Sequence, residues 1–571
     1  MQFLLDPLPG QEEIVDDPGS PPPEELSDES PENSPPPKRR RPEAGFYRRI
    51  HRGFSVNDDS VEDDPITIND VLKSPFKDDW LKAIDSEIQS LVETETFEAC
   101  DLPEGRNAVG ARWIFKSKMK SDGTIERRKA RLVAQGFLQQ EGIVFMETFA
   151  PVVRFDTVRA CLSVAAAKNL LVLQMDVVTA FLNGNLEEEI YLRVPSGVPS
   201  VYEKIWLLRR SLYGLKQSPR QWGIRLSEFL NSIGFRRSDN DPCLWIAQKD
   251  IWILVYVDDL VLIGPHLPSL HLLQAKLRDS FKMKDLGVLN YFLGVAVSIS
   301  PAGIRLSQKL YAEDILTRFN MNSCRPVAMP MDPGLFNQMS SDATELISVR
   351  PYQRAIGALL YLVTMTRPDL AFAVSALSRF LAKPRKVHQK ALEHVFRYLK
   401  GTTDLSILFR SSLRSPALKA FSDADWAGCK TTRRSTSGYL LLFGNSPISW
   451  RSQRQPCVAL STMEAEYIAA CSTAQEIVWM RRLLTELMVP CLGPTYLHED
   501  NQSCIAFAQE PKFHRNTKHI ELRYHFLRER VEAKEIALVY VPSDKQLADP
   551  FTKPLSAQGH LSAFRHIFSD I

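Results

Sequence analysis

The sequence predicts a mixed α+β protein with about three to four domains that follow a segment without a core of its own. Its 571 residues are 44% apolar and 24% charged, which is the composition of a globular protein too long for one core. Apolar runs joined by tight turns indicate β-hairpins, while other strand-like runs pass into helical repeats. We find no repeat of the length used by solenoids. A mixed architecture follows.

Charge, cysteines and hydropathy narrow the class of protein further. The net charge is only +2, so a nucleic-acid surface requires local clustering of basic residues. The nine cysteines are scattered and none forms a C-x-x-C pair, which favours free thiols in a reducing compartment. No apolar run approaches the roughly 18–20 residues that span a bilayer, and no secretory signal precedes the chain. We therefore expect no membrane partner.

Residues 1–64 are predicted to be a disordered linker. Proline, serine and acidic residues dominate it first, and the basic block Lys38–Arg41 follows. Such a composition buries too little apolar area to offset the entropy of ordering. The basic block is either a solvated charge run or a functional segment, and the sequence leaves both interpretations open. The functional segment would be a nuclear-import signal or a nucleic-acid-binding arm.

The first ordered elements are a helix and a basic hairpin. Apolar residues recur at helical spacing from Trp80 to Leu91. The run from Trp113 to Lys120 then alternates, a Ser-Asp-Gly turn follows at 121–123, and the return strand is 125–134. Seven basic residues crowd this hairpin: Lys116, Lys118, Lys120, Arg127, Arg128, Lys129 and Arg131.

Three aspartates interrupt the apolar strands that come next. After the helix "DTVRACLSVAAAKNL", the strand "LVLQMDVV" runs into Asp176. After the helix "QWGIRLSEFLNSIGF", the hairpin "LVYVDDLVLIG" carries Asp258 and Asp259 at its tip. Three carboxylates at strand ends suit two Mg²⁺ ions that stabilise an in-line phosphoryl transfer. The alternative is that each aspartate is a turn residue, since aspartate favours turns.

The second half of the chain predicts basic helices and then a second α/β unit. Helices between residues 349 and 400 break near Pro368 and Pro384, and their polar positions are mostly basic. From Ala417 onward, strands and helices carry four acidic residues on separate elements: Asp423, Glu466, Asp500 and Asp549. If these acids converge, they form a second two-metal site.

These motifs resemble a known family. "YVDDLVLIG" resembles the Tyr-x-Asp-Asp hairpin of reverse transcriptases, and "QMDVVTAFLNGNLEEEIYLRVPSG" and "RRSLYGLKQSPRQW" resemble copia-type (Pseudoviridae) LTR retrotransposon Pol polyproteins. The resemblance covers roughly residues 70–557. It implies a right-hand polymerase followed by a ribonuclease H-like α/β domain. The expected boundaries are fingers and palm 65–310, thumb and connection 311–412, ribonuclease H-like domain 413–557 and tail 558–571.

The resemblance also implies roles for polymerase residues. It makes Asp176, Asp258 and Asp259 metal ligands, with Asp176 and Asp258 expected to bridge the ions and Asp259 the less definite ligand. It makes Phe181 the steric gate against the ribose 2′-OH, and Tyr213 and Gly214 contacts to the incoming nucleotide. It also implies that three basic residues of the fingers contact the triphosphate: Lys116, Arg128 and Arg131. For each basic residue, a solvated face is the alternative. "FLGV" at 292–295 resembles the primer-grip hairpin.

The four later acids lie in motifs that resemble ribonuclease H in its copia form: "SDADWAG", "STMEAEY", "EDNQS" and "QLADPFTKPL". The resemblance makes Asp423, Glu466, Asp500 and Asp549 metal ligands. Two neighbours, Asp425 and Glu464, are the alternatives to the first two of these. The histidine-bearing loop expected before the last aspartate is missing, which leaves proton shuttling unassigned. His519 and His525 are near in sequence, but a lone histidine is more often structural.

We therefore expect an RNA- and DNA-directed DNA polymerase of an LTR retrotransposon, with ribonuclease H activity on RNA–DNA hybrids and two Mg²⁺ or Mn²⁺ ions per active site. The expected partners are an RNA template, a DNA primer/template, dNTPs, a tRNA-type primer, and the Gag and integrase of the same element. The chain resembles the 3′ part of a Pol polyprotein. We expect it in a cytoplasmic virus-like particle or in the nucleus. Two alternatives are a catalytically silent, domesticated nucleic-acid-binding copy and an unrelated two-metal nuclease or nucleotidyltransferase.

Overall fold

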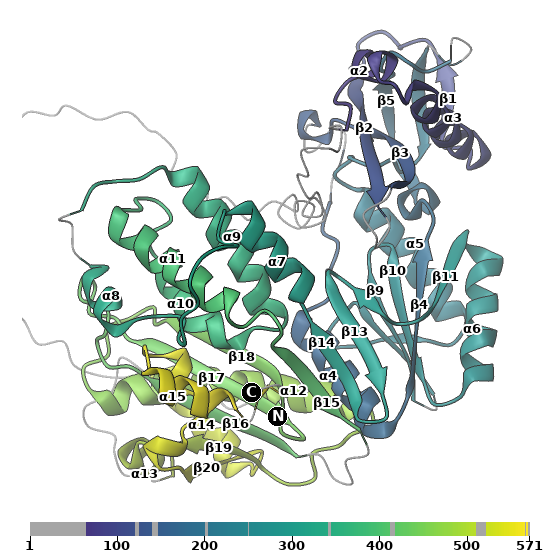
Figure 1. Ribbon diagram of the computed structural model, residues 1–571. Coiled ribbons are helices and arrows are strands. Elements are labelled where there is room, and N and C mark those ends of the chain that lie inside the picture. Colours follow the sequence, from purple (N-terminus) through teal and green to yellow (C-terminus); the bar gives the residue numbers. More distant parts are fainter. Residues whose placement is uncertain are drawn as a thin grey trace, which may run out of the picture. The chain divides into compact units, whose positions relative to one another are not determined.

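The structure is a computed structural model that describes residues 64–568 apart from 120–124, 140–144, 146, 200–201, 203, 249, 341–343, 412–416, 510–520 and 566 (Figure 1). The chain divides into two compact units, residues 1–57 and 58–571, and every described residue belongs to the second. Three predictions lie outside the described residues: the N-terminal linker with its basic block, the turn at 121–123, and His519.

The first part of the fold is a five-stranded sheet covered by a helix. Its strand order is β1-β6-β5-β2-β3, with bounds Phe97–Cys100, Ile205–Arg210, Asn185–Arg193, Val109–Met119 and Ile125–Ala134. Helix α2 (Ile68–Lys73) precedes α3 (Lys77–Glu93), whose Trp80 and Leu91 are buried in a core with Trp113 and Leu132. The predicted helix and the β2–β3 hairpin are both confirmed.

The second part is a six-stranded antiparallel sheet with helices packed on one face. Its order is β11-β4-β10-β9-β8-β7, with bounds Met283–Val288, Leu171–Val177, Asp259–Gly264, Ile251–Tyr256, Leu244–Ala247 and Arg236–Arg237. Met175 and Leu260 face a core that includes Trp222 of α5 (Ser218–Ser232) and Leu270 of α6 (Leu267–Ser280). Alternating side chains of β4 and β10 therefore point away from these helices.

A small sheet and a helical group follow. The sheet order is β12-β13-β14-β15, with bounds Tyr291–Phe292, Val295–Ser300, Gly303–Ser307 and Ser406–Arg410. Between β14 and β15 lie α7 (Lys309–Arg318), α8 (Pro333–Gln338), α9 (Val349–Met365), α10 (Ala371–Ser378) and α11 (Lys386–Lys400). The helices break at both predicted prolines. In the "FLGV" hairpin Leu293 and Gly294 both have positive φ, as a type I′ turn requires.

The last part is a five-stranded sheet of order β18-β17-β16-β19-β20, with bounds Ser446–Arg454, Thr436–Phe443, Leu418–Ala424, Thr495–Glu499 and Ile536–Tyr540. The first three strands are antiparallel, and β16, β19 and β20 are parallel. Its helices are α12 (Thr462–Glu486), α13 (Gln502–Gln509), α14 (Glu521–Glu532) and α15 (Ala557–Phe564). Helix α15 occupies residues that were predicted to form a tail. The segment packs against the fold because its Phe564 is buried.

Two general expectations can be compared with the described residues. The combination of antiparallel hairpins and parallel strand–helix units confirms the mixed fold class. Among the helices of the described chain, none is both long and apolar enough to cross a membrane.

Candidate active sites

The aspartate pair lies at a tight, strained turn. Strands β9 and β10 are joined by Val257 and Asp258 alone, and Asp259 pairs with Tyr256 across them. Val257 has a φ of 56°, which a β-branched residue adopts at a cost of about 1–3 kcal/mol. Trp222 Nε1 donates a 2.7 Å hydrogen bond to the Val257 carbonyl. The surrounding structure thus holds the turn in a single conformation.

Register places the third aspartate beside this turn. Asp176 pairs directly with Asp259 across β4 and β10, so both side chains lie on the face away from α5 and α6. The amide of Val177 donates a 2.8 Å hydrogen bond to the Asp258 carbonyl. Within the described residues, this trio is not among the acidic groups whose ligand oxygens all lie within 4.8 Å of one another.

Two aromatic rings and an arginine of the basic hairpin lie together near the aspartate turn. Phe181 follows β4 in the short helix η2 (Ala180–Asn183), and its ring centroid lies 4.8 Å from that of Tyr213. The guanidinium of Arg131 lies over the Tyr213 ring, 4.5 Å from its centroid. Burial raises the pKa of Tyr213, and the nearby charge of Asp258 adds to that rise. Three predicted site residues are thereby brought together beside Asp258.

The basic hairpin separates the three residues predicted to contact a triphosphate. Cross-strand pairing puts Arg131 on the same face as Lys129 and its partner Lys116. Arg128 pairs with Ser117 on the opposite face, where its guanidinium lies 3.9 Å from the ring centroid of Phe76. The prediction for Arg128 therefore needs correction, because its side chain packs against the start of α3. Lys129 is the residue that shares a face with Lys116 and Arg131.

Gly214 is held where no side chain fits. Its φ is +99°, and a Cβ built there would lie 2.1 Å from the carbonyl oxygen of Ala134. The amide of Ala134 donates a 2.8 Å hydrogen bond to the neighbouring Tyr213 carbonyl. The glycine therefore lets the "LYGLKQSP" loop approach the end of β3, and its requirement is explained by packing alone.

Replacing Gly214 by alanine is expected to destabilise the protein by about 2–4 kcal/mol, through backbone strain together with overpacking. Urea-induced unfolding followed by tryptophan fluorescence measures this change. Gly223→Ala is the matched control, because Gly223 lies inside α5 with open space around its Cβ position. That control is expected to be neutral or to stabilise by about 0.5–1 kcal/mol. Equal unfolding midpoints for the two variants would contradict the packing argument.

The four later acids converge at one end of the last sheet. Asp423 ends β16, Asp500 follows β19 and Asp549 begins a short helix, and one oxygen from each lies within 4.8 Å of the others. A second such group combines Glu466 of α12 and Glu499 of β19 with the same Asp500. Two acidic groups that share one carboxylate are a suitable donor set for two hard divalent cations.

Burial makes this convergence of carboxylates costly unless cations neutralise them. Burial raises the pKa of Glu466 well above its ordinary value, and the charge of Glu499 raises it further. Burial also raises the pKa of Asp549 to about 7, with the charge of Asp423 contributing. In the described chain, Glu466 Oε2 is buried and makes no hydrogen bond. Five converging carboxylates with Lys553 as the cation that contacts them in the described chain fit a cation site better than a structural role.

The two alternative acids have structural roles instead. Asp425 accepts a hydrogen bond from the amide of Thr436, the first residue of β17. Glu464 Oε2 accepts a 2.8 Å hydrogen bond from the amide of Leu460, which caps the start of α12. His525 is exposed on α14 and belongs to neither acidic group, so proton shuttling stays unassigned.

Sequence reasoning missed two residues of this cluster. Glu499 is fully buried and accepts a 2.9 Å hydrogen bond from Ser422 Oγ. Lys553 Nζ lies 2.9 Å from Asp549 Oδ1 and 3.8 Å from Asp423 Oδ2. Two signals were present: Glu499 directly precedes Asp500, and Lys553 is four residues after Asp549, a spacing that places side chains together.

Comparison with known proteins identifies the family. The model of the family described as "Reverse transcriptase (RNA-dependent DNA polymerase)" matches residues 94–333. A Ty5-1 transposon protein of Saccharomyces cerevisiae is 34% identical over 312 residues, covering 53% of this chain and 100% of the relative. The chain belongs to the copia-type retrotransposon Pol family.

Longer relatives and solved structures are also similar to this chain. The Retrovirus-related Pol polyprotein from transposon TNT 1-94 of Nicotiana tabacum is 39% identical over 507 residues, covering 86% of this chain and 38% of the relative. The chain thus spans less than half the length of this relative. A foamy viral protease-reverse transcriptase in complex with an RNA/DNA hybrid aligns at 13% identity and a TM-score of 0.44, covering 81% of this chain and 53% of that one.

Proposed function

We propose that this copia-type Pol chain is an RNA- and DNA-directed DNA polymerase that also hydrolyses RNA in RNA–DNA hybrids. The observation that carries the first activity is the strained hairpin that fixes Asp258 and Asp259 beside Asp176. Family membership supports the same reaction, since the family model that matches residues 94–333 is that of reverse transcriptases.

The chain's own residues supply positioning and charge in the polymerase reaction. Asp176, Asp258 and Asp259 would hold two Mg²⁺ or Mn²⁺ ions. When bound, such ions stabilise the attacking and leaving oxygens of phosphoryl transfer. Phe181 and Tyr213 form the wall beside Asp258, where the sugar and base of an incoming dNTP would be oriented.

The fingers surface would neutralise the triphosphate. Lys116, Lys129 and Arg131 share one face of the β2–β3 hairpin, and Arg131 also stacks on Tyr213. Cations on that face attract phosphate oxygens and guide the leaving pyrophosphate. Arg128 has no place in this proposal because its face packs against α3.

The second activity is proposed from the convergent carboxylates of the last sheet. The oxygens of Asp423, Asp500 and Asp549 approach one another, and Glu466 and Glu499 share Asp500 with them. These residues would hold two divalent cations, which activate water for hydrolysis of an RNA phosphodiester. The proposed partners are a tRNA-type primer and the Gag and integrase of the same element. The proposed location is a cytoplasmic particle or the nucleus.

Primer extension on heteropolymeric RNA with Mg²⁺ and dNTPs tests the first activity, and cleavage of labelled RNA in a hybrid tests the second. The wild-type chain is expected to perform both reactions. If it binds a duplex and yet extends no primer and cuts no hybrid, the catalytically silent copy is the better description.

Replacing Phe181 by alanine is expected to let the polymerase use ribonucleotides roughly 10- to 100-fold better relative to dNTPs. The buried ring beside Tyr213 would otherwise occupy the space of a ribose 2′-OH. Single-nucleotide incorporation with rNTP and dNTP in parallel measures the ratio of kcat/KM values. Phe181→Tyr is the control, because it keeps the ring and should keep dNTP preference. An unchanged ratio in the alanine variant would exclude Phe181 as the gate.

A further inference from the structure

Asp64, with which the described chain begins, binds the β2–β3 hairpin. Its Oδ1 accepts a 2.8 Å hydrogen bond from the amide of Ser117 in β2, and its Oδ2 lies 4.0 Å from Lys116 Nζ. The side chain of Asp64 is 27% exposed, so most of it is covered. The chain that leads into α2 is therefore anchored on the hairpin by one carboxylate, which is 53 residues from its partner in the sequence.

The edge of β2 that receives Asp64 has no strand beside it. Strand β2 pairs with β3 from Ala111 to Met119, whereas its pairing with β5 is limited to Val109 and Gly110. Among the described strands, none pairs with β2 beyond Gly110 on the side of β5. Hydrogen-bonding groups along such an open edge bind other stretches of chain, so a further segment can dock there.

One face of the hairpin beside this edge collects positive charge. Four basic residues share that face by register: Lys116, Arg127, Lys129 and Arg131. Lys116 and Lys129 are direct cross-strand partners, and like charges in that position repel each other. Asp64 lies beside Lys116, and the buried carboxylate of Glu87 interacts with the charges of Lys129 and Arg131. The four cations exceed these two acids, so the face attracts further anions.

The chain before Asp64 carries the opposite charge. Residues 58–64 read DDSVEDD, a run with five acidic residues and no basic residue. Fully extended, residues 58–63 reach about 20 Å from Asp64. Strand β2 ends at Met119, which is only about 7 Å beyond Ser117 along the strand. The acidic run is therefore long enough to cover the outer part of the hairpin and its cations.

We propose that residues 58–64 dock on the basic face of the β2–β3 hairpin and compete there with the triphosphate of an incoming nucleotide. The inference rests on the proposed function, which assigns the same cations to the triphosphate, and adds a means of regulating that site. Asp64 is the anchor, because it already joins the amide of Ser117 to Lys116. The acids before it bring more negative charge to the face, so the contact is autoinhibitory until phosphates displace the segment.

Carbodiimide cross-linking of the full chain tests the docking directly, because the reagent joins a carboxylate to a lysine amine with no spacer. Peptide mass spectrometry is expected to find residues 58–64 joined to Lys116 or Lys129, and excess tripolyphosphate should suppress that product. An equal mixture of isotope-labelled and unlabelled chains shows whether both ends of the cross-link belong to one molecule. Mixed-isotope products, or products with lysines of other elements alone, would overturn the proposal.

Calorimetric titration with tripolyphosphate in EDTA measures the competition without catalysis. Converting the five acids to amides is expected to lower Kd about 5- to 10-fold, because the cations lose their internal competitor. The variant carries these changes: Asp58→Asn, Asp59→Asn, Glu62→Gln, Asp63→Asn and Asp64→Asn. A matched control removes the same number of charges far upstream in the sequence: Glu12→Gln, Glu13→Gln, Asp16→Asn, Asp17→Asn and Glu24→Gln. The control should keep the wild-type Kd within about twofold, since distant exposed charges are screened.

Equal gains in affinity in both variants would show a general effect of net charge and overturn the proposal. The gain should also vanish when Lys116→Gln and Lys129→Gln are added, since these are cations that the segment covers. Neither measurement requires DNA synthesis. A chain that extends no primer but shows the cross-link and the gain refutes the proposed polymerase and leaves the docking standing.

Discussion

Asp258→Asn is expected to reduce DNA synthesis by about 10²–10³-fold or more while leaving affinity for a primer/template within about twofold of wild type. Asparagine keeps the size of the side chain and the turn geometry that Trp222 and Val177 hold in place. It removes the charge that, in the proposed function, would help to hold a divalent cation beside Asp176. Primer extension in the steady state, together with anisotropy binding in EDTA, separates the loss of catalysis from a loss of binding.

Asp279→Asn is the matched control for this experiment. Asp279 is an exposed residue on α6, which packs against the opposite face of the same sheet. The control should extend primers at the wild-type rate, because it removes the same charge without touching the turn. Extension by Asp258→Asn at more than about a tenth of the wild-type rate would show that the aspartate pair is not the catalytic centre.

Sequence patterns predicted those parts of the fold in which local signals and burial agree. The apolar residues of α3 recur at helical spacing and are buried, and the hairpin of β9 and β10 brings its aspartates to the tip. A proline marks each break between the basic helices. In these places the pattern of apolar residues specifies one structure, so the spacing of those residues was sufficient to predict the element.

Register and close approach could not be predicted in the same way. A shift of one residue moves a strand's side chains to the opposite face, which is why Lys129, and not the predicted Arg128, shares a face with Lys116 and Arg131. The pairing contains an irregularity between Lys118 and Met119 that no local pattern indicates. Glu499 and Lys553 lie close to predicted ligands in the sequence, but only the packing of β16, β19 and α12 shows that their side chains join the acidic cluster.

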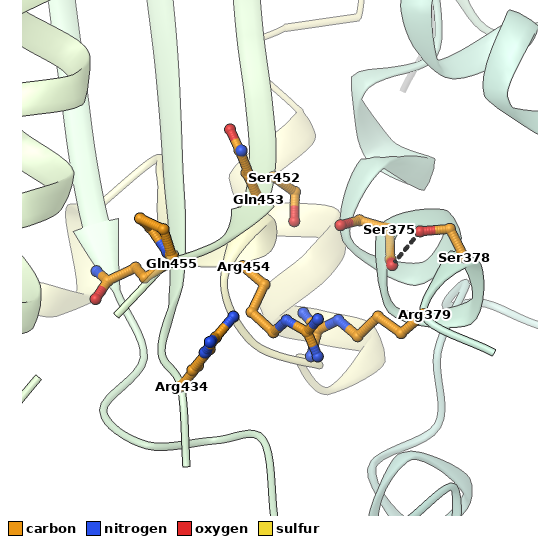
Figure 2. Close-up of a pocket in the computed structure, with 9 residues that line it drawn as sticks. Ser375, Ser378, Arg379, Arg434, Ser452, Gln453, Arg454 and Gln455 are labelled. Carbon is orange, nitrogen blue, oxygen red and sulfur yellow. Dashed lines mark hydrogen bonds between the residues drawn. The ribbon is translucent and has the colours of Figure 1, made fainter. Parts of the chain in front are cut away.

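A polar cavity lined by three arginines, shown in Figure 2, illustrates the same limit. Arg379 directly follows α10, Arg434 precedes β17 and Arg454 ends β18, so up to 75 residues separate them along the chain. Each one alone is equally consistent with a solvated surface charge. Only the antiparallel pairing of β17 with β18, and the packing of α10 against them, brings the three guanidinium groups into one space.

Asp500→Asn is expected to abolish hydrolysis of RNA in a hybrid, with a loss of about 10³-fold, while primer extension stays at the wild-type rate. Asp500 belongs to both acidic groups, so its loss removes a ligand oxygen from each of them at once. Its Oδ2 accepts a 2.7 Å hydrogen bond from Ser543 Oγ, which the amide oxygen of asparagine can still accept. Asp544→Asn is the control and should cleave normally, because Asp544 is exposed and directly follows Ser543 in the short helix Ser543–Lys545.

Thermal melting distinguishes this loss of a ligand from a loss of fold. The two acidic groups together contain five different carboxylates, and Lys553 is the cation that contacts them within the described chain. Removing one negative charge relieves repulsion, so Asp500→Asn should melt in EDTA at the same temperature as wild type or higher. Mg²⁺ should raise the melting temperature of wild type and do so much less for the variant. A variant that melts earlier in EDTA and responds fully to Mg²⁺ would show that Asp500 supports the fold and holds no ion.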